Sequence, residues 1–212
     1  MAFNSLAEEG ATGIVAPLIS SGISGTVASA QAAARQFTRV PVEIIDTRIT
    51  SMGQVMIILA AARAAEQGAS LQEVRLAADE VSNRLHVFFA VDTLEYLHRG
   101  GRINGASRYF GTALDIKPIL FFNSEGKIDA LERVRTRKKA LQRLIALAEQ
   151  QTNGHPVYVG IMHANVPQAA QGFRDEVEQR LNCKEIFTVD FSPVISVHVG
   201  PGTIGIAFHT EY

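Results

Sequence analysis

The amino-acid sequence predicts an α/β fold in two domains, a parallel-sheet α/β domain followed by an α+β domain with a mixed or antiparallel sheet. In the first 84 of the 212 residues, short apolar runs alternate with longer segments of helical character. Such alternation is typical of βαβ units, whose strands are parallel. Farther along, two apolar runs flank the turn residues Ser124-Glu125-Gly126, which predicts a β-hairpin. Hairpins combined with helices indicate the α+β arrangement of the second part.

The first part is expected to contain two strands and three helices. In chain order, these elements occupy residues 12–19 (strand), 27–37 (helix), 42–46 (strand), 52–67 (helix) and 70–84 (helix). The second helix should end before Gly68, because the left-handed backbone that follows many helices suits glycine. Ser70 and Glu73 have the S-x-x-E spacing of a capping box, which predicts the start of the third helix.

The pattern of elements changes after residue 84. The second part is expected to contain, in order, a strand (85–91), a short helix (93–98), the hairpin strands (116–122 and 127–134), a long helix (136–150), a strand (157–163), a helix (167–181) and three short strands up to residue 210, the last two over 194–199 and 204–210. We therefore place a domain boundary near residue 84, which divides the chain into residues 1–84 and 85–212.

Composition and charge exclude several classes of protein. With 47% hydrophobic and 19% charged residues, the chain is not of the disordered type. Its net charge of −1 gives no general attraction for nucleic acid or an acidic membrane. Cys183 is the only cysteine and no Cys or His spacing fits zinc, so we expect neither a disulfide nor a metal or other cofactor. No apolar segment is long enough for a membrane span and no secretory signal is present, so we expect a cytoplasmic protein.

The segment Ser20–Thr26, SSGISGT, lies where a predicted strand ends and a helix begins. The first turn of a helix has unpaired N–H groups and a positive partial charge, which favour an anionic group. The serine hydroxyls add donors, and the glycines let a ligand approach the backbone closely. An anion site is therefore one interpretation, and the other is that Ser24 merely caps its helix.

Two apparent motifs are rejected on their spacing. A nucleophile elbow needs G-x-S-x-G, whereas Gly25 directly follows Ser24, which argues against a serine hydrolase. Residues 200–205, GPGTIG, match the G-x-G-x-x-G of dinucleotide-binding proteins, but the sequence ends at Tyr212 without the required helix, strand and acidic residue. We expect instead a glycine-rich turn between two strands, with His198 beside a site that the glycines open to a ligand.

Basic residues gather where the second hairpin strand meets the long helix: Arg133, Arg135, Arg137, Lys138 and Lys139. A helix start disfavours cations, so an anionic partner or a phosphate is favoured over a solvated face. Arg102, in Gly100-Gly101-Arg102, is a weaker candidate of the same kind.

Six segments occur in an informative order: SSGISGT (20–26), IIDTRITSMGQ (44–54), VDTLEYLHRGGRIN (91–104), LDIKPIL (114–120), RVRTRKKA (133–140) and HVGPGTIG (198–205). In order and spacing they resemble the DegV family of bacterial fatty-acid-binding proteins, some of which are the acyl-carrying subunit of fatty acid kinase. The resemblance implies two α/β domains. Residues 1–84 would carry the serine-rich turn, and residues 85–212 would close the lipid pocket that holds one long-chain fatty acid.

The resemblance also implies roles for individual residues. Ser24 and Gly25, with Ser21, would hold the carboxylate of the fatty acid, and His198 would complete its hydrogen bonds. Arg102 and either Arg135 or Arg137 would lie near the pocket mouth, where the acyl phosphate forms or the kinase docks. The expected protein is a carrier without catalytic activity, which presents the fatty acid to a separate ATP-dependent fatty acid kinase.

One departure from the family pattern leaves alternatives open. Family members begin with a further segment that carries the first strand and a Thr-Ser motif whose threonine binds the carboxylate, and we expect this segment to be absent here. A chain without it would lack one carboxylate ligand and one strand, and could be a truncated module with no ligand. The other alternative is an enzyme acting on an acyl or phosphorylated substrate, with Ser24 as nucleophile and His198 as base.

Overall fold

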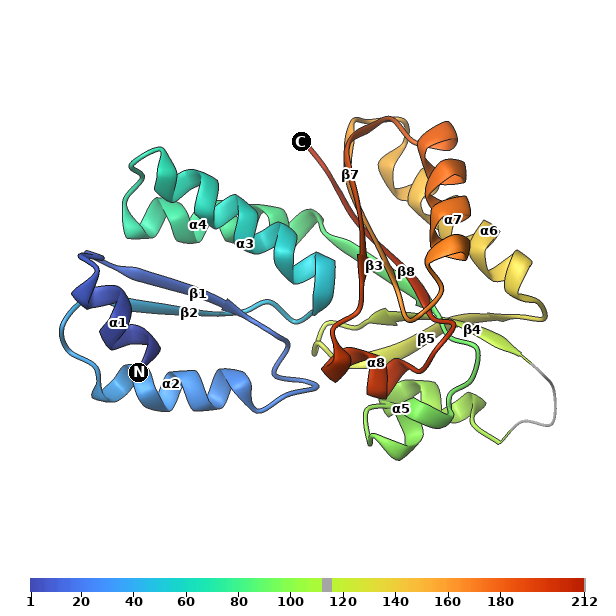
Figure 1. The fold of residues 1–212 in the computed structure, drawn as a ribbon, viewed down its shortest axis with the longest axis horizontal. Coiled ribbons are helices and arrows are strands. Elements are labelled where there is room, and N and C mark those ends of the chain that lie inside the picture. The colour runs from blue at the N-terminus through green and yellow to red at the C-terminus, as the bar shows by residue number, and fades with distance from the viewer. Residues whose placement is uncertain (112–115, 212) are drawn as a thin grey trace. The chain divides into compact units, whose positions relative to one another are not determined.

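The computed structural model describes residues 1–111 and 116–211 (Figure 1). The segment 114–120, one of the six motifs above, begins with Leu114 and Asp115, which lie outside the described residues. The chain divides into two compact units. Unit 1 contains Met1–Thr50 and Gln54–Asn83, and unit 2 contains Ser51–Gly53 and Arg84–Tyr212.

Unit 1 is built around two parallel strands, β1 (Ile14–Leu18) and β2 (Val42–Asp46). The pairing runs from Ile14 opposite Val42 to Leu18 opposite Asp46, so the carboxyl ends of the two strands lie side by side. The helices are α1 (Ala2–Glu8), α2 (Thr26–Gln36), α3 (Ser51–Glu66) and α4 (Leu71–Arg84). Figure 1 shows α1 and α2 on one side of the strand pair, and α3 and α4 on the other. The predicted parallel sheet is confirmed.

The predicted junction between α3 and α4 is confirmed in detail. Gly68 follows the end of α3 in the left-handed conformation, with φ at +81°. The N–H of Ser70 donates to the Glu73 carboxylate at 2.7 Å, and the N–H of Glu73 donates to Ser70 Oγ at 3.4 Å. Helix α1 was not predicted, and none of its residues is buried.

Unit 2 contains a six-stranded sheet with the order β5-β4-β3-β8-β6-β7. The strands are β3 (His86–Ala90), β4 (Lys117–Phe122), β5 (Ile128–Val134), β6 (Val157–His163), β7 (Cys183–Asp190) and β8 (Ile204–Thr210). Strands β6 and β7 are parallel, and the other described neighbours are antiparallel, including the predicted hairpin β4–β5. The expected mixed sheet is confirmed.

Helices α6 (Arg137–Thr152) and α7 (Pro167–Arg180) lie together on one face of this sheet (Figure 1). Apolar side chains from both helices and from β8 form the core of unit 2, among them Leu144, Ile145, Phe173, Val177, Ile206 and Phe208. Each is at most 2% exposed, and burial of such a side chain stabilises a fold by about 1.5–3 kcal/mol. The sheet of unit 2 is therefore a firm support for its shorter elements, α5 (Glu95–Arg99), the 3-10 helix η1 (Asn104–Tyr109) and α8 (Pro193–Val199).

The expected strand over residues 194–199 is wrong, because this segment forms helix α8. Pro193 occupies its first turn, where the fixed φ of proline suits a helix and the missing N–H costs no hydrogen bond. Val194 and Val197 lie three residues apart on the exposed side, at 67% and 65% exposure, whereas Val199 is buried. The β-branched residues and their alternation with Ser and His indicated a strand, but proline at the helix start prevailed locally. His198 therefore belongs to a helix and precedes a helix-to-strand connection, not a hairpin turn.

Candidate functional site

The serine-rich turn lies at the carboxyl end of β1 and leads directly into α2. Ser20 is fully buried, and its Oγ accepts from the N–H of Gly22 at 3.1 Å. Its carbonyl oxygen accepts from the N–H groups of Ile23 and Ser24 at 3.2 and 3.1 Å. These bonds fold the turn around Ser20 and set the position from which α2 begins.

Helix α2 begins without a side-chain cap. Its N-cap residue is Gly25, which has no side chain, so Ser24 does not occupy the capping position that the alternative interpretation required, although its Oγ accepts from the N–H of Thr26. Among the described residues, no acceptor is bonded to the N–H groups of Val27 and Ala28. A β-carbon built on Gly25 would meet no atom within 4 Å, so the space beside it is open. A helix start with open space and unused N–H groups can hold an anionic group.

Ser24 and Thr26 form a hydroxyl pair at this helix start. Their oxygens are 2.8 Å apart, and Ser24 Oγ also accepts from the N–H of Thr26 at 3.3 Å. The bond between the hydroxyls uses one of their two hydrogens, so one hydrogen remains to be donated. Thr26 was not singled out from the sequence, although it stands within the same motif.

Asp46, at the end of β2, binds Ser21. Its carboxylate accepts from Ser21 Oγ at 2.5 Å and from the N–H of Ser21 at 3.1 Å, and also from the N–H of Arg48 at 3.1 Å. Burial alone would raise the pKa of Asp46, but the bonds from Ser21 and Arg48 hold it below its ordinary value. Sequence reasoning missed this residue. The available signal was its place at the end of a strand parallel to β1, since such strand ends meet at one sheet edge.

His198 lies in unit 2, with its ring against the backbone of Gly100. A β-carbon at Gly100 would lie 2.2 Å from Nδ1 of His198. That nitrogen is buried and has no hydrogen-bond partner among the described residues, so no carboxylate orients the ring as in a Ser-His-Asp triad. Burial lowers the pKa of His198, and the nearby charge of Arg102 lowers it further. The exposed Arg102 also donates from Nη1 to the Gly100 carbonyl at 2.6 Å, so unit 2 brings His198 and Arg102 together.

Gly200 and Gly202 do not open space for a ligand, contrary to expectation. Both have left-handed backbone, with φ at +79° and +85°. A β-carbon at Gly200 would lie 2.3 Å from the ring of Tyr96, and one at Gly202 would lie 2.0 Å from the Asp92 carboxylate. The protein's own side chains fill the space beside both glycines.

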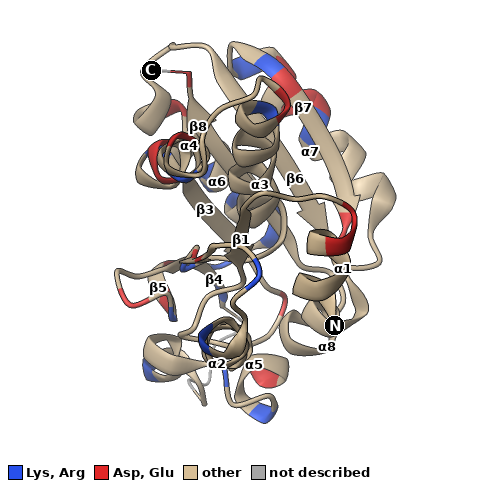
Figure 2. Ribbon diagram, turned by 90° about the vertical axis from the view of Figure 1, so that its left-hand side faces the viewer, with Lys and Arg blue, Asp and Glu red and all other residues tan. Residues whose placement is uncertain are grey.

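The basic cluster at residues 133–139 has several separate roles. Arg137 pairs with Asp92 at 2.9 Å, and the guanidinium of Arg133 lies 5.6 Å from the centre of the Tyr109 ring. Thr136 caps α6 by accepting from the N–H of Lys139 at 3.3 Å. Arg135 is exposed and makes no ion pair with another described residue. Figure 2 shows charges of both signs distributed along the ribbon, and their numbers nearly balance in the net charge of −1.

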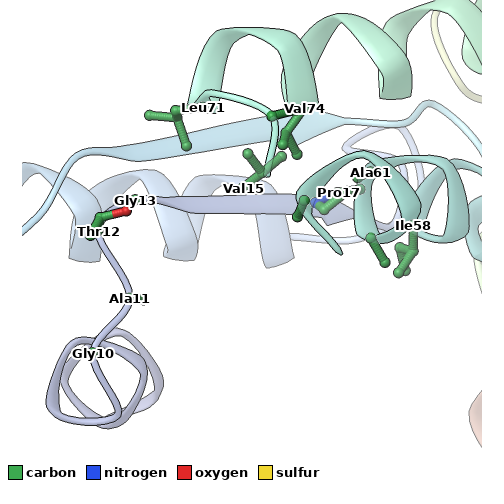
Figure 3. A pocket seen from close by; sticks show the side chains of 13 residues that line it. Gly10, Ala11, Thr12, Gly13, Val15, Pro17, Ile58, Ala61, Leu71 and Val74 are labelled. Atoms are coloured by element: carbon green, nitrogen blue, oxygen red, sulfur yellow. The ribbon is translucent and has the colours of Figure 1, made fainter. Parts of the chain in front are cut away.

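Unit 1 also contains a groove of about 590 Å³ along β1 (Figure 3). Val15 and Pro17 of β1 line it together with residues from the preceding loop, α3 and α4, and none of the lining residues is charged. Its volume is within the usual range of small-molecule sites. The groove can take an apolar group, but it offers no cation to hold a carboxylate or a phosphate.

The described part of the chain contains neither a candidate membrane span nor a candidate metal site. None of its helices combines the length and the apolar composition needed to cross a membrane. No three His, Cys, Asp or Glu residues within residues 1–111 and 116–211 gather in a way that could hold a metal ion.

Solved structures of related proteins have the same fold. A structure described as fatty acid binding of a DegV family protein from Thermus thermophilus matches with a TM-score of 0.91 and 33% identity, over 99% of this chain and 75% of that one. DegV of Bacillus subtilis, described as a fatty acid binding protein, matches with a TM-score of 0.86 and 30% identity, over 99% of this chain and 75% of that one. The predicted α/β fold class is thereby confirmed.

Sequence comparison identifies relatives of the same family. A DegV domain-containing protein of Streptomyces coelicolor is 38% identical over 205 residues, which are 96% of this chain and 72% of that protein. Protein DegV of Bacillus subtilis is 34% identical over 192 residues, 90% of this chain and 68% of that protein. A family model described as "Uncharacterised protein, DegV family" matches residues 1–211. The chain therefore belongs to the DegV family.

Proposed function

We propose that this chain binds a long-chain fatty acid and that the serine-rich turn of unit 1 holds its carboxylate. The observation that carries the proposal is the start of α2, with unused N–H groups on Val27 and Ala28, open space beside Gly25 and a spare hydroxyl hydrogen on the Ser24–Thr26 pair. A carboxylate that leaves water must be hydrogen-bonded, because an unpaired buried charge is costly. The DegV relatives of Thermus thermophilus and Bacillus subtilis, both described as fatty acid binding, support this choice of anion.

The contacts of the carboxylate follow from the donors that the turn leaves unused. We assign them to Ser24, with Thr26 as its hydroxyl partner, and to the N–H groups of Val27 and Ala28. Gly25 contributes through its missing side chain, because the space beside it is empty. Bonds from such donors to a carboxylate are charge-assisted and stronger than bonds between neutral groups.

We propose His198 as a further hydrogen-bond partner of the carboxylate, because of the residues that surround it in unit 2. Its ring is partly buried, Nδ1 lacks a partner among the described residues, and the cation Arg102 lies nearby. A neutral imidazole can donate one hydrogen bond to an anion. The role of His198 is tested by its own variant, independently of Ser24.

We further propose that the chain is a carrier, which presents the bound fatty acid to a separate ATP-dependent kinase in the cytoplasm. Arg102 and Arg135 are the proposed contacts of the phosphate or the kinase, because both are exposed cations. Arg137 is a weaker candidate than Arg135, since Asp92 already binds its guanidinium. A carrier of this kind needs no nucleophile of its own.

The proposal is tested by titrating the purified chain with oleate and palmitate in a calorimeter, and by mass spectrometry of lipids extracted from the protein. We expect Ser24→Ala to weaken binding about tenfold, the loss that corresponds to one charge-assisted hydrogen bond. Ser29→Ala is the matched control, because Ser29 is exposed on the next turn of α2. A folded chain that carries no fatty acid and binds none on titration would overturn the proposal.

A further inference from the structure

The end of β2 is fastened to the serine-rich turn through a single carboxylate. Asp46 accepts from both donors of Ser21, with Oδ2 bonded to the hydroxyl at 2.5 Å and Oδ1 to the N–H at 3.1 Å. The N–H of Arg48 donates to the same Oδ1 at 3.1 Å. One side chain therefore holds the turn after β1 and the loop after β2 together.

Further bonds join the same two segments. The N–H of Ser20 donates to the carbonyl of Ile49 at 2.9 Å. Thr47, which is 3% exposed, donates from its N–H to the Leu18 carbonyl at 3.1 Å and from Oγ1 to the same oxygen at 2.7 Å. The loop itself contains Arg48 at a φ of +57°, a left-handed conformation that persists only where its surroundings fix it. The framework is thus rigid on both sides of Asp46.

The hydroxyl of Ser21 has no hydrogen left for an anionic ligand. A serine hydroxyl carries one hydrogen, and that of Ser21 is donated to Asp46. The lone pairs of its oxygen repel a carboxylate, which is an acceptor only. Ser24 differs, because its hydroxyl pair with Thr26 retains one hydrogen.

We propose that Asp46 is a positioning residue for the carboxylate site, and that Ser21 serves Asp46 and does not contact the ligand. This inference rests on the proposed function. Asp46 acts through Ser21: it fixes the turn, and the turn places Ser24 at the start of α2. Of the two serines assigned to the ligand from the sequence, only Ser24 then binds it directly.

The division of roles predicts a specific pattern of fatty-acid affinities. Asp46→Ala removes all three bonds to the carboxylate and should weaken oleate binding about three- to tenfold, whereas Ser21→Ala removes only the hydroxyl bond and should weaken it by a smaller factor. The double variant should bind oleate no more weakly than Asp46→Ala alone, because Asp46→Ala has already removed the bond that Ser21→Ala would break. If Ser21 instead contacted the ligand, the loss of binding free energy in the double variant would equal the sum of the losses in the two single variants.

Asp46→Asn separates positioning from charge. The amide oxygen of the substituted side chain can still accept from the N–H groups of Ser21 and Arg48, and its NH₂ group can donate to Ser21 Oγ. That exchange releases the hydroxyl hydrogen of Ser21. We expect Asp46→Asn to bind oleate at least as tightly as the unchanged chain, and Ser21→Ala to weaken binding when it is combined with Asp46→Asn.

The experiment measures oleate binding by calorimetry for all these variants, with melting curves to confirm folding. Ser5→Ala is the control, since Ser5 Oγ donates to Glu9 at 3.0 Å on an exposed face of the same unit. Non-additive losses, with the smaller loss in Ser21→Ala, support the proposal. Additive losses, or unchanged affinity in Asp46→Ala, overturn it.

A second measurement needs no ligand and keeps the two proposals distinguishable. Hydrogen exchange of the Ser21 amide should be slow in the unchanged chain and in Asp46→Asn, and at least tenfold faster in Asp46→Ala, while the exchange of the Ser5 amide stays the same. Unchanged exchange in Asp46→Ala overturns the assignment of Asp46, whatever the ligand result. An unchanged chain that binds no oleate overturns the proposed function instead.

Discussion

Arg137 and Asp92 form an ion pair directly against the backbone of Gly202. Nη1 of Arg137 lies 2.9 Å from Oδ1 and 3.0 Å from Oδ2 of Asp92. A β-carbon at Gly202 would lie 2.0 Å from Oδ2 and 3.2 Å from Nη1. The pair and the glycine therefore depend on each other, and together they hold the connection that leads from α8 to β8.

Gly202→Ala should destabilise unit 2. Gly202 has φ at +85°, and left-handed backbone at a residue with a side chain costs on the order of 1–3 kcal/mol. The added methyl group also displaces Asp92, which lowers the free energy of unfolding further. Urea denaturation measures this decrease. Gly154→Ala is the control for backbone strain alone, because Gly154 has φ at +78° and no atom within 4 Å of a β-carbon. Equal losses in the two variants would contradict the proposed role of the ion pair.

Arg135→Ala and Arg137→Ala should differ, although the two residues are neighbours in one basic cluster. Arg137→Ala should lower the free energy of unfolding by about 1 kcal/mol or less, because the side chains of the pair are 34% and 42% exposed. Arg135→Ala should leave both the Tm and oleate binding unchanged and reduce phosphorylation of the bound fatty acid by the proposed kinase. Melting curves, calorimetry and a coupled kinase assay measure these effects. A loss of oleate binding in Arg135→Ala would contradict the assignment of Arg135 to the partner.

Much of the fold was predictable because local signals and tertiary structure agree. The strand Val42–Asp46 and the capping box of Ser70 and Glu73 were predicted from periodicity and spacing, and tertiary packing preserves both. Helix α8 was mispredicted because its β-branched residues favour a strand, while Pro193 favours a helix start. Where the residue preferences of a short segment conflict, its packing against the rest of the protein determines whether it forms a helix or a strand. The periodicity of the sequence does not describe that packing.

The candidate site was predictable only where one segment carries the information. Ser24 and Gly25 stand within a single strand-to-helix turn, so the sequence alone indicates an anion site there. Asp46 lies 25 positions from Ser21, and Asp92 lies 45 positions from Arg137. Neither pairing follows from local spacing, because each depends on which strand ends the fold brings together.

The stability of unit 2 should depend on pH through His86. Its ring stacks on Phe208 at a centroid distance of 5.3 Å, and burial lowers its pKa below the ordinary value of 6.5. The unfolded chain then binds a proton at a higher pH than the folded chain does. The free energy of unfolding should be highest above pH 6.5 and fall as the pH drops below that value.

His86→Phe tests this dependence, because phenylalanine keeps the stacking and removes the titrating group. Denaturation at pH 5 and pH 8 should show a smaller difference in the variant than in the unchanged chain. His155→Phe, in the turn after α6, is the control for removal of a histidine that has no ring contact among the described residues. An unchanged difference in His86→Phe would assign the pH dependence to other groups.

Gly100→Ala should affect fatty-acid binding through His198. A β-carbon at Gly100 would lie 2.2 Å from Nδ1, so the imidazole must move. We therefore expect Gly100→Ala and His198→Ala to weaken oleate binding by similar factors, about three- to tenfold for one hydrogen bond. Gly172→Ala is the control, since Gly172 lies in α7 with no atom near a β-carbon. Full affinity in His198→Ala would remove His198 from the carboxylate site.

Strand β1 has an edge that invites pairing with another chain. Within the described residues it pairs with β2 alone. Pro17 offers no N–H, and its carbonyl accepts from the Gln54 side chain at 3.2 Å, so one end of the edge is blunted. Val15 lies two residues before Pro17 in the strand and lines the uncharged groove of Figure 3. We therefore expect the unpaired edge beside the apolar groove to favour self-association.

Val15→Lys should reduce that self-association, because a lysine places a charge in the groove and natural sheets use lysine to protect their edges. Sedimentation velocity over a hundredfold range of concentration should show a rising average mass for the unchanged chain and a smaller rise for Val15→Lys. Val197→Lys makes the same substitution at a 65% exposed position on α8 and should behave like the unchanged chain. If Val197→Lys reduced the association and Val15→Lys did not, the contact would belong to α8. A constant mass for the unchanged chain would mean that the blunted end at Pro17 is sufficient to protect the edge.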